Sequence, residues 1–301
     1  MATIVDNNNT DVGSVTSDVV APTPTTKKYI KPGKFDDMAR ASQDVLSNNE
    51  AFDGMRLEYQ GAIGNVQTSN TFHLGSSEEA PPYALTTVFS RGNATVVAKY
   101  DSDVKLFARS IYSSNIFTNT FTFQINKEKN IYLGGDAEFS IRSTNLYFKY
   151  DTNRTFTANI FQALQKKWAV GLEYANIPSQ QAEFYSAGVR WKKGKGETYS
   201  FNISNITGFG LNYSRRQNNL ELATEFAVSP HPHTGALMSK TVFGARYAFH
   251  ASLFKIRADT DGSIIGMYEE ILGGFARLCF CAHLNYFTND YKIGLGIQIS
   301  K

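Results

Sequence analysis

Long hydrophobic runs are missing from this chain of 301 residues. No stretch approaches the ~18 consecutive apolar residues that a membrane-spanning helix needs. Hydrophobic residues nevertheless make up 42% of the chain and aromatic residues 13%. The chain is therefore either a soluble protein or one that crosses a membrane as β-strands, and its mean hydropathy of -0.30 does not separate these two classes.

Cysteine is scarce as well. Cys279 and Cys281 lie two apart on one predicted strand, side by side on the same face, in an orientation that disfavours a disulfide. Neither a Cys-x-x-Cys motif nor a Cys/His cluster accompanies them, so we expect a reduced structural pair and no metal or cofactor. The chain also lacks a nucleophile elbow, a phosphate loop and an HExxH motif, which argues against an enzyme.

A strong charge of one sign is missing too. The net charge of +3 is too mild to imply a nucleic-acid partner, and charged residues scattered at alternating strand positions predict a polar lumen. The N-terminal residues contain neither the basic and apolar regions of a secretory leader nor the Arg-rich pattern of a matrix transit peptide. We therefore expect synthesis in the cytosol, which disfavours a bacterial outer-membrane protein.

Two-faced strands fill most of the chain. The final stretch, residues 291–300, alternates Ile293, Leu295, Ile297 and Ile299 with Lys292, Gly294, Gly296 and Gln298. The same rhythm, interrupted by turn-forming residues, predicts about nineteen strands from residue 53 onward. The predicted ranges are 53–61, 66–75, 83–90, 94–101, 104–112, 116–124, 131–139, 141–150, 155–163, 167–175, 182–191, 197–204, 209–216, 220–228, 240–249, 252–260, 263–270, 276–286 and 291–300.

This pattern predicts an all-β fold, a closed transmembrane β-barrel over residues 52–301. Strands of about eight to ten residues cross a bilayer when tilted, and closure pairs every lipid-facing backbone group. An odd strand total requires the first and last strands to pair in parallel. Aromatic residues near strand ends are typical of membrane girdles: Tyr100, Tyr112, Tyr150, Tyr174, Tyr247 and Tyr286. A soluble β-sandwich or lipocalin-like carrier is the alternative, with these aromatics half-buried in an ordinary sheet.

The N-terminal region differs from the rest. Residues 1–33 are rich in polar residues and proline and predict a disordered tail. Within residues 34–47, Phe35, Met38, Val45 and Leu46 follow helical spacing, and acidic residues occupy the first turn. The sequence therefore predicts one short amphipathic helix.

Two ends of the predicted barrel resemble the mitochondrial porin superfamily and, within it, the channel-forming subunits of the outer-membrane protein translocase. Residues 252–270 combine a basic strand, an Asp-x-x-Gly turn and an acidic strand end, and they are followed by a strand with His283 and by residues 290–296. Residues 52–57 and 70–76 resemble the first hairpin of that family. The closing string Lys292-x-Gly294-x-x-Ile297-x-Ile299 is similar to the sorting signal of mitochondrial barrels.

The resemblance implies a protein-conducting channel of the mitochondrial outer membrane that passes unfolded precursors from the cytosol to the intermembrane space. It also implies that the helix lies in the lumen, although its apolar stripe also fits a membrane-surface helix. The implied partners are precursors with Arg-rich presequences, receptor and small helical subunits, the lipid bilayer and further copies of the chain, with no nucleic acid. A voltage-dependent anion or metabolite channel is the alternative, but the Gly-Leu-Lys motif of that sister family is absent and a long polar tail is present.

A channel for Arg-rich segments needs acidic groups on its lumen face. Strand alternation places these candidates for presequence contact there: Glu58, Asp101, Glu173, Glu183, Glu221, Glu225, Asp259 and Glu269. The same alternation puts many basic residues inside, so the predicted lumen has mixed charge. For each candidate, a role in a charge-balanced, hydrated lining is the competing interpretation.

Overall fold

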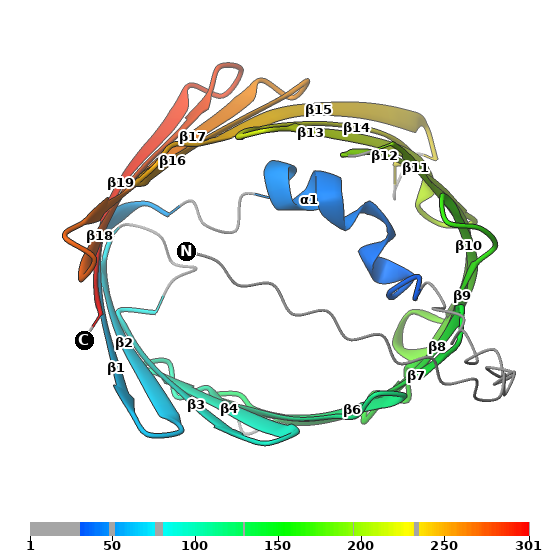
Figure 1. Ribbon diagram of the computed structural model, residues 1–301, viewed down its shortest axis with the longest axis horizontal. Helices are drawn as coiled ribbons and strands as arrows, with labels where there is room; N and C mark the ends of the chain where they lie inside the picture. The colour runs from blue at the N-terminus through cyan, green and yellow to red at the C-terminus, as the bar shows by residue number, and fades with distance from the viewer. Residues whose placement is uncertain are drawn as a thin grey trace, which may run out of the picture.

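The computed structural model describes residues 31–47, 52–75, 81–128, 130–194, 196–231 and 235–300. Nineteen strands form one sheet that closes into a barrel (Figure 1), which confirms the predicted fold. In chain order they are β1 (Gly54–Ile63), β2 (Val66–Leu74), β3 (Tyr83–Arg91), β4 (Ala94–Asp101), β5 (Leu106–Ser113), β6 (Phe117–Ile125), β7 (Ile131–Ile141), β8 (Thr144–Asp151), β9 (Phe156–Ala163), β10 (Trp168–Ile177), β11 (Ala182–Lys193), β12 (Glu197–Ser204), β13 (Gly208–Gln217), β14 (Leu220–Pro230), β15 (Leu237–Ala248), β16 (Ser252–Asp259), β17 (Ser263–Leu272), β18 (Ala276–Asn285) and β19 (Asp290–Ser300).

The barrel closes through a parallel pair of strands, as an odd total requires. β1 pairs with β19 from Gly54 opposite Gly294 to Gln60 opposite Ser300. Each other neighbouring pair is antiparallel and consecutive in sequence. Because no strand edge is left unpaired, each strand has hydrogen-bonding neighbours on both sides, which a sheet in hydrocarbon requires.

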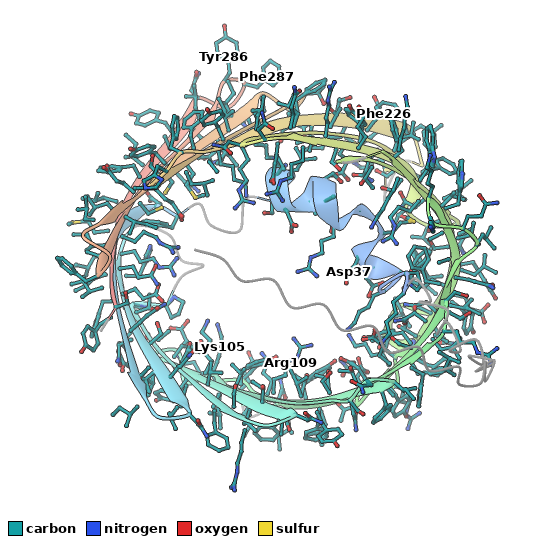
Figure 2. All side chains as sticks on the ribbon, viewed as in Figure 1. Asp37, Lys105, Arg109, Phe226, Tyr286 and Phe287 are labelled. Atoms are coloured by element: carbon teal, nitrogen blue, oxygen red, sulfur yellow. The ribbon has the colours of Figure 1, made fainter. Side chains whose placement is uncertain are left out.

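The outer face of the barrel is apolar. In β1, Met55, Leu57 and Tyr59 are 43–56% exposed, and in β19 Ile293 is 71% exposed. Figure 2 shows the labelled Phe226 pointing outward and the labelled Arg109 pointing into the lumen. Large apolar side chains that cover the whole outside of a protein are costly in water and favourable in lipid. The predicted girdle residues Tyr100, Tyr112, Tyr150 and Tyr286 are all exposed on this face.

The N-terminal helical segment lies inside the barrel (Figure 1). It begins with one turn of 3-10 helix (Asp36–Ala39) and continues as α1 (Arg40–Leu46), so it is less regular than the single helix that the sequence predicts. α1 runs along β13, β14, β15 and β16, and the 3-10 turn contacts β11 and β12. A second short 3-10 turn (Pro178–Gln180) joins β10 to β11.

Within the described residues, no helix combines the length and the apolar character that crossing a membrane would require. The predicted tail lies almost entirely outside the described residues, which begin at Lys31.

Candidate functional site: the barrel lumen

The inward face of the wall is identified by its contacts with the helical segment. Gly171 of β10 lies against Phe35, and Gly188 of β11 lies against Met38. Because side chains alternate along a strand, every second residue from these positions faces the lumen, and the strand register extends the assignment around the barrel.

Acidic and basic side chains both line the lumen. The inward acidic residues of the strands are Glu58, Asp101, Asp136, Glu138, Asp151, Glu173, Glu221, Glu225, Asp259, Glu269 and Asp290. The inward basic residues are Arg56, Lys99, Arg109, Lys149, Arg190, Lys192, Arg216, Lys240, Arg246, Lys255, Arg257, Arg277 and Lys292. The lining therefore has mixed charge with an excess of cations.

The first half of the helical segment is held by an apolar seat in the wall. Phe35 and Met38 are 5% and 6% exposed and form a cluster with Phe161 and Ala169. The Phe35 and Phe161 rings meet edge to face, with centroids 6.0 Å apart. A Cβ atom on Gly188 would lie 2.6 Å from the Met38 Cε atom, so the absence of a side chain there makes room for the helix.

The second half has a seat of its own. Val45 and Leu46 are 1% and 4% exposed and pack on Ala223 of β14 and Val242 of β15. A Cβ atom on Gly244 of β15 would lie 2.7 Å from Leu46 Cδ2. Four apolar side chains thus leave water together, each contributing roughly 1.5–3 kcal/mol, which is enough to hold a short helix whose own propensity is weak.

Polar contacts fix the segment at several points. Ser42 Oγ donates a hydrogen bond to Asn212 Oδ1 at 3.2 Å, in the middle of the buried face. Lys34 Nζ lies 3.3 Å from Glu138 Oε2, and Lys255 Nζ donates to Ser47 Oγ at 3.2 Å. The helix therefore narrows the lumen as a docked part of the wall.

Several predicted acidic candidates are ion-paired with neighbouring cations. Glu58 Oε2 lies 3.0 Å from Arg56 Nη2, and Glu269 Oε2 lies 3.7 Å from Arg277 Nη1. Glu221 has Arg216 at 3.2 Å and Arg246 at 3.4 Å. A carboxylate paired in this way offers less net negative potential to a passing cation than a free one.

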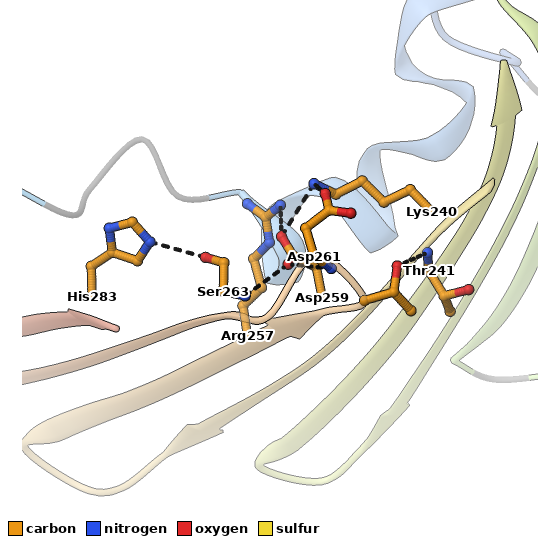
Figure 3. A network of polar contacts seen from close by, with 8 residues as sticks. Lys240, Thr241, Arg257, Asp259, Asp261, Ser263 and His283 are labelled. Carbon is orange, nitrogen blue, oxygen red and sulfur yellow. Dashed lines mark hydrogen bonds and ion pairs between the residues drawn. The ribbon is translucent and has the colours of Figure 1, made fainter. Parts of the chain in front are cut away.

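A network at one end of the lumen involves another candidate, Asp259 (Figure 3). Its Oδ2 atom lies 3.3 Å from Lys240 Nζ and 3.5 Å from Arg257 Nη2. Its Oδ1 atom accepts hydrogen bonds from the backbone N–H groups of Asp261 at 3.2 Å and Ser263 at 3.0 Å. With its side chain only 5% exposed, this carboxylate organises the turn between β16 and β17.

Asp101 has a similar role. It is 7% exposed, and its Oδ1 accepts a hydrogen bond from Lys105 N at 2.9 Å, which shapes the turn between β4 and β5. Asp151, which the sequence prediction left out, accepts bonds from Asn153 N at 2.9 Å and Thr155 N at 3.0 Å. The main role of these inward aspartates at strand ends is therefore to stabilise turns, and not to contact a passing peptide.

Glu173 and Glu225 form a different group. Both face the lumen on the strands that carry the helix, and both are half-buried. Across the described residues, neither carboxylate has a hydrogen bond or an ion pair. Glu58, Glu221, Asp259 and Glu269 differ from these two in having ion-pair partners on the wall.

Glu183 is not where the sequence prediction placed it. It lies at the start of β11 and shares the outward face with Tyr185, Val189 and Trp191. Tyr185 donates its hydroxyl hydrogen to Glu183 Oε2 at 2.6 Å. The prediction that Glu183 lines the lumen is therefore wrong: at a strand end, an acidic residue meets the polar membrane interface and has no need to face inward.

The part of the wall away from the helix contains a polar recess. Strands β1–β4, called the open wall below, enclose a volume of about 730 Å³. Its polar lining residues are Arg56, Glu58, Gln60, Gln67, Thr68, Ser69, Thr71, His73, Thr86, Lys99 and Ser300. Glu58 Oε1 accepts hydrogen bonds here from Gln60 Nε2 at 2.7 Å and Ser69 Oγ at 2.8 Å.

The predicted sorting string lies at the seam between β19 and β1. Lys292 and Gly294 face inward, whereas Ile297 and Ile299 face outward. The inward side of the seam is covered by Phe52, and a Cβ atom on Gly296 would lie 2.9 Å from the Phe52 Cζ atom. The sorting role of the string stays a prediction.

Sequence reasoning missed some inward residues. Asp136 and Glu138 of β7 face the lumen, and Glu138 holds Lys34 of the helical segment. The alternation within residues 131–139 contained this signal, because both residues alternate with the apolar Leu133, Ala137 and Phe139. The sequence did not indicate that Gly171, Gly188 and Gly244 make room for the helix, since glycine also occurs in turns.

Comparison with known sequences gives a consistent result. The profile of the eukaryotic porin family matches residues 31–294. The chain is 24% identical over 304 residues to the "Mitochondrial import receptor subunit TOM40" of Saccharomyces cerevisiae, covering 90% of this chain and 78% of the yeast protein. It is also 24% identical over 294 residues to the corresponding subunit of Neurospora crassa, covering 89% of this chain and 82% of that protein.

Comparison with solved structures found likenesses of low sequence identity. A structure described as "Asymmetric conductivity of engineered proteins" has a TM-score of 0.50 and 6% identity, covering 77% of this chain and 96% of its own. A triple mutant of the Rhodopseudomonas blastica porin has a TM-score of 0.42 and 12% identity, covering 77% and 89%. The first of these likenesses supports the barrel fold and carries no information on cargo.

Proposed function

The chain belongs to the eukaryotic porin family, and from that premise we propose that it is the protein-conducting channel of the mitochondrial outer membrane. In this role it passes unfolded precursor proteins from the cytosol to the intermembrane space. The similarity to two fungal TOM40 subunits over about nine-tenths of the chain supports this assignment over other members of the family. No bond is made or broken in this activity, so the residues of the lumen act by binding weakly and at many places.

The observation that carries the proposal is the two-sided lumen. One side presents apolar and unpaired acidic groups around a docked helix, and the other presents a recess lined by amides, hydroxyls and ion pairs. An unfolded chain with basic, apolar and polar residues finds weak partners along such a wall, whereas strong binding at one place would stall it. We propose Glu58, Glu173, Glu225 and Glu269 as presequence contacts, with Asp101, Glu221 and Asp259 contributing to the general potential.

Single-channel recording in planar bilayers tests the proposal. A synthetic Arg-rich presequence peptide at micromolar concentration is expected to block the current transiently, more often as voltage drives the peptide into the pore. A peptide of the same length with Arg replaced by Gln is the matched control. Absence of blockade by the Arg-rich peptide, together with strong anion selectivity and voltage gating, would overturn the assignment.

A metabolite or anion channel is the second candidate, because cations outnumber anions among the inward strand residues. This candidate predicts a preference for chloride over potassium and indifference to presequence peptides. Reversal potentials in a salt gradient measure that preference directly.

The TOM40 relatives are named as subunits, so we propose that this chain also works within a larger translocase. Receptor subunits, small helical subunits and further copies of the chain are the proposed partners. The tail, residues 1–33, is a candidate for meeting them, and the closing string with Lys292, Gly294, Ile297 and Ile299 is proposed as the membrane-insertion signal.

A further inference from the structure

The outward face of β10–β13 carries side chains in chemically distinct rows. In the strand register, Lys193 lies opposite Glu197, which lies opposite Arg215, and these form a charged row at the rim. The next row inward along the strands is aromatic, with Trp168, Trp191, Tyr199 and Tyr213. The row below is aliphatic or aromatic, with Val170, Val189, Phe201 and Leu211.

The aromatic row is a continuous series of ring contacts, stacked from Trp168 through Trp191 to Tyr199 and tilted at Tyr213. The Trp168 and Trp191 rings have centroids 5.4 Å apart at an interplanar angle of 14°, and Trp191 and Tyr199 have centroids 5.1 Å apart at 27°. Tyr213 extends the series with a centroid distance of 4.9 Å from Tyr199. Such a ladder makes a flat amphipathic shelf at the depth where a bilayer changes from hydrocarbon to headgroups.

The charged row above the shelf has a net positive charge. Lys193 is exposed and its Nζ lies 6.0 Å from the Trp191 ring centroid. Arg215 Nε lies 3.7 Å from Glu197 Oε1, yet the Arg215 side chain is still 49% exposed. Lys166 and Lys167, in the turn before β10, are exposed next to the same shelf.

Below the shelf the surface is hollowed. A groove of about 400 Å³ lies between Trp168, Trp191, Tyr199, Phe201, Leu211 and Phe226. Its surface is almost wholly apolar, so hydrocarbon fills it better than water does. The groove, the aromatic shelf above it and the cationic rim follow one another in the same order as the acyl chain, the interfacial region and the headgroup of a phospholipid.

We propose that this surface is a binding site for a phospholipid with an anionic headgroup. Its phosphate lies between Lys193 and Arg215, and one acyl chain occupies the groove. Charge complementarity favours an anionic lipid over a zwitterionic one, because each cation near a membrane surface strengthens the attraction to a negative headgroup. Glu197 opposes this attraction and holds Arg215 in place, so it sets the affinity. The site is independent of the cargo that the lumen passes.

The chain provides its own reporter for this site. Both of its two tryptophans, Trp168 and Trp191, belong to the shelf. The full-length protein is reconstituted in phosphatidylcholine bilayers that contain increasing fractions of dibrominated phosphatidylglycerol or, separately, dibrominated phosphatidylcholine with the same chains. Bromine quenches tryptophan fluorescence on contact, so the two curves give the relative affinity of the shelf for the two headgroups.

We expect phosphatidylglycerol to bind about fivefold more tightly than phosphatidylcholine, the effect of one net cation near the surface. K193Q combined with R215Q is expected to bring the ratio to about one, and E197Q is expected to raise it above the native value. R91Q is the matched control, since Arg91 is an exposed outward cation at the same rim that lies beyond the aromatic row. It is expected to leave the ratio unchanged.

Equal quenching by the two lipids in the native protein would overturn the proposal. This is the result expected if the groove binds a protein helix and not a lipid. An unchanged preference in K193Q/R215Q, or a loss in R91Q of the same size, would also overturn it. Far-ultraviolet circular dichroism and the tryptophan emission maximum in pure phosphatidylcholine establish that each variant is folded. Lys193, Arg215 and Arg91 are exposed and Glu197 is half-buried, and glutamine has nearly the same size as glutamate, so the barrel is expected to assemble normally.

Discussion

The barrel has two kinds of inner wall. The helix-covered wall, β9–β16, presents Gly171, Gly188, Gly244, Ala223 and Val242, which together form an apolar seat. The open wall, β1–β4, presents amides, hydroxyls and ion-paired charges around a recess. Both walls are built from strands of the same kind, so they differ in the side chains that face the lumen, which are every second residue of each strand. An unfolded precursor would therefore pass between a wall that carries the docked helix and a wall that presents its own polar side chains directly.

A glycine at the seam next to the open wall gives the largest expected effect. The Cβ atom of Gly294→Ala would press on the Cys281 Sγ atom and on the Phe52 backbone, where β19 meets β1. We expect Gly294→Ala combined with Ile297→Ala to assemble poorly in mitochondria, as measured by carbonate-resistant membrane insertion after import. Gly266→Ala is the control, because nothing lies within 4 Å of its Cβ position. Normal insertion of the double variant would show that the string is only a strand.

The seat on the helix-covered wall is the next feature to break. Phe35→Ala combined with Met38→Ala removes two buried side chains, each worth roughly 2–5 kcal/mol in a well-packed site. We expect the helical segment to detach, and single-channel conductance and current noise to rise. Val88→Ala, which trims an apolar group in the recess of the open wall, is expected to leave both unchanged. Native conductance in the Phe35 and Met38 variant would show that the helix does not narrow the pore.

These two walls also show what the sequence could and could not predict. The number of strands and the apolar outer face follow from the alternation of apolar and polar residues, which is visible in each strand separately. Small shifts arose at turns: residue 141 belongs to β7, because the chain turns at Arg142 with a positive φ of 53°. The seat for the helix was not predictable, since pairing Met38 with Gly188 depends on how residues far apart in sequence meet in space.

The charged residues were predicted by the same rule with one informative failure. Alternation places Glu58 and Glu173 inside correctly, but Glu183 has the same parity as Tyr185 and therefore faces outward. The ion pairs of the open wall were also invisible, because cross-strand partners depend on register. The alternation along a strand therefore predicts which way a residue faces. The register between strands determines whether an acidic residue is paired with a cation or is left to bind a passing peptide.

The third prediction concerns the negative charge of Glu58 in the recess of the open wall. Glu58→Gln leaves Arg56 without its partner on the open wall and makes the recess more positive. We expect the residence time of an Arg-rich peptide in the pore to fall roughly twofold to fivefold, the size of a solvent-accessible ion pair. Glu183→Gln is the control, because that carboxylate faces outward. Equal losses in both variants would place the effect at the pore entrance and not in the recess.

The smallest expected effect is a pH dependence of helix docking. Asp36 keeps an exposed surface, but partial desolvation by the surrounding protein, followed by the nearby Asp37 carboxylate, raises its pKa above the ordinary value of 3.8. The protonated form is thus favoured when the segment is docked, so docking is strongest below that ordinary value and weakens as pH rises through the higher docked pKa. Current noise from a detaching helix is expected to increase over this interval, and Asp36→Asn is expected to remove the increase. Asp44→Asn is the matched control, since it removes one carboxylate from the same segment and leaves the neighbouring Asp36 and Asp37 unchanged. A pH dependence that persists in Asp36→Asn would assign the titration to the wall and not to the helix.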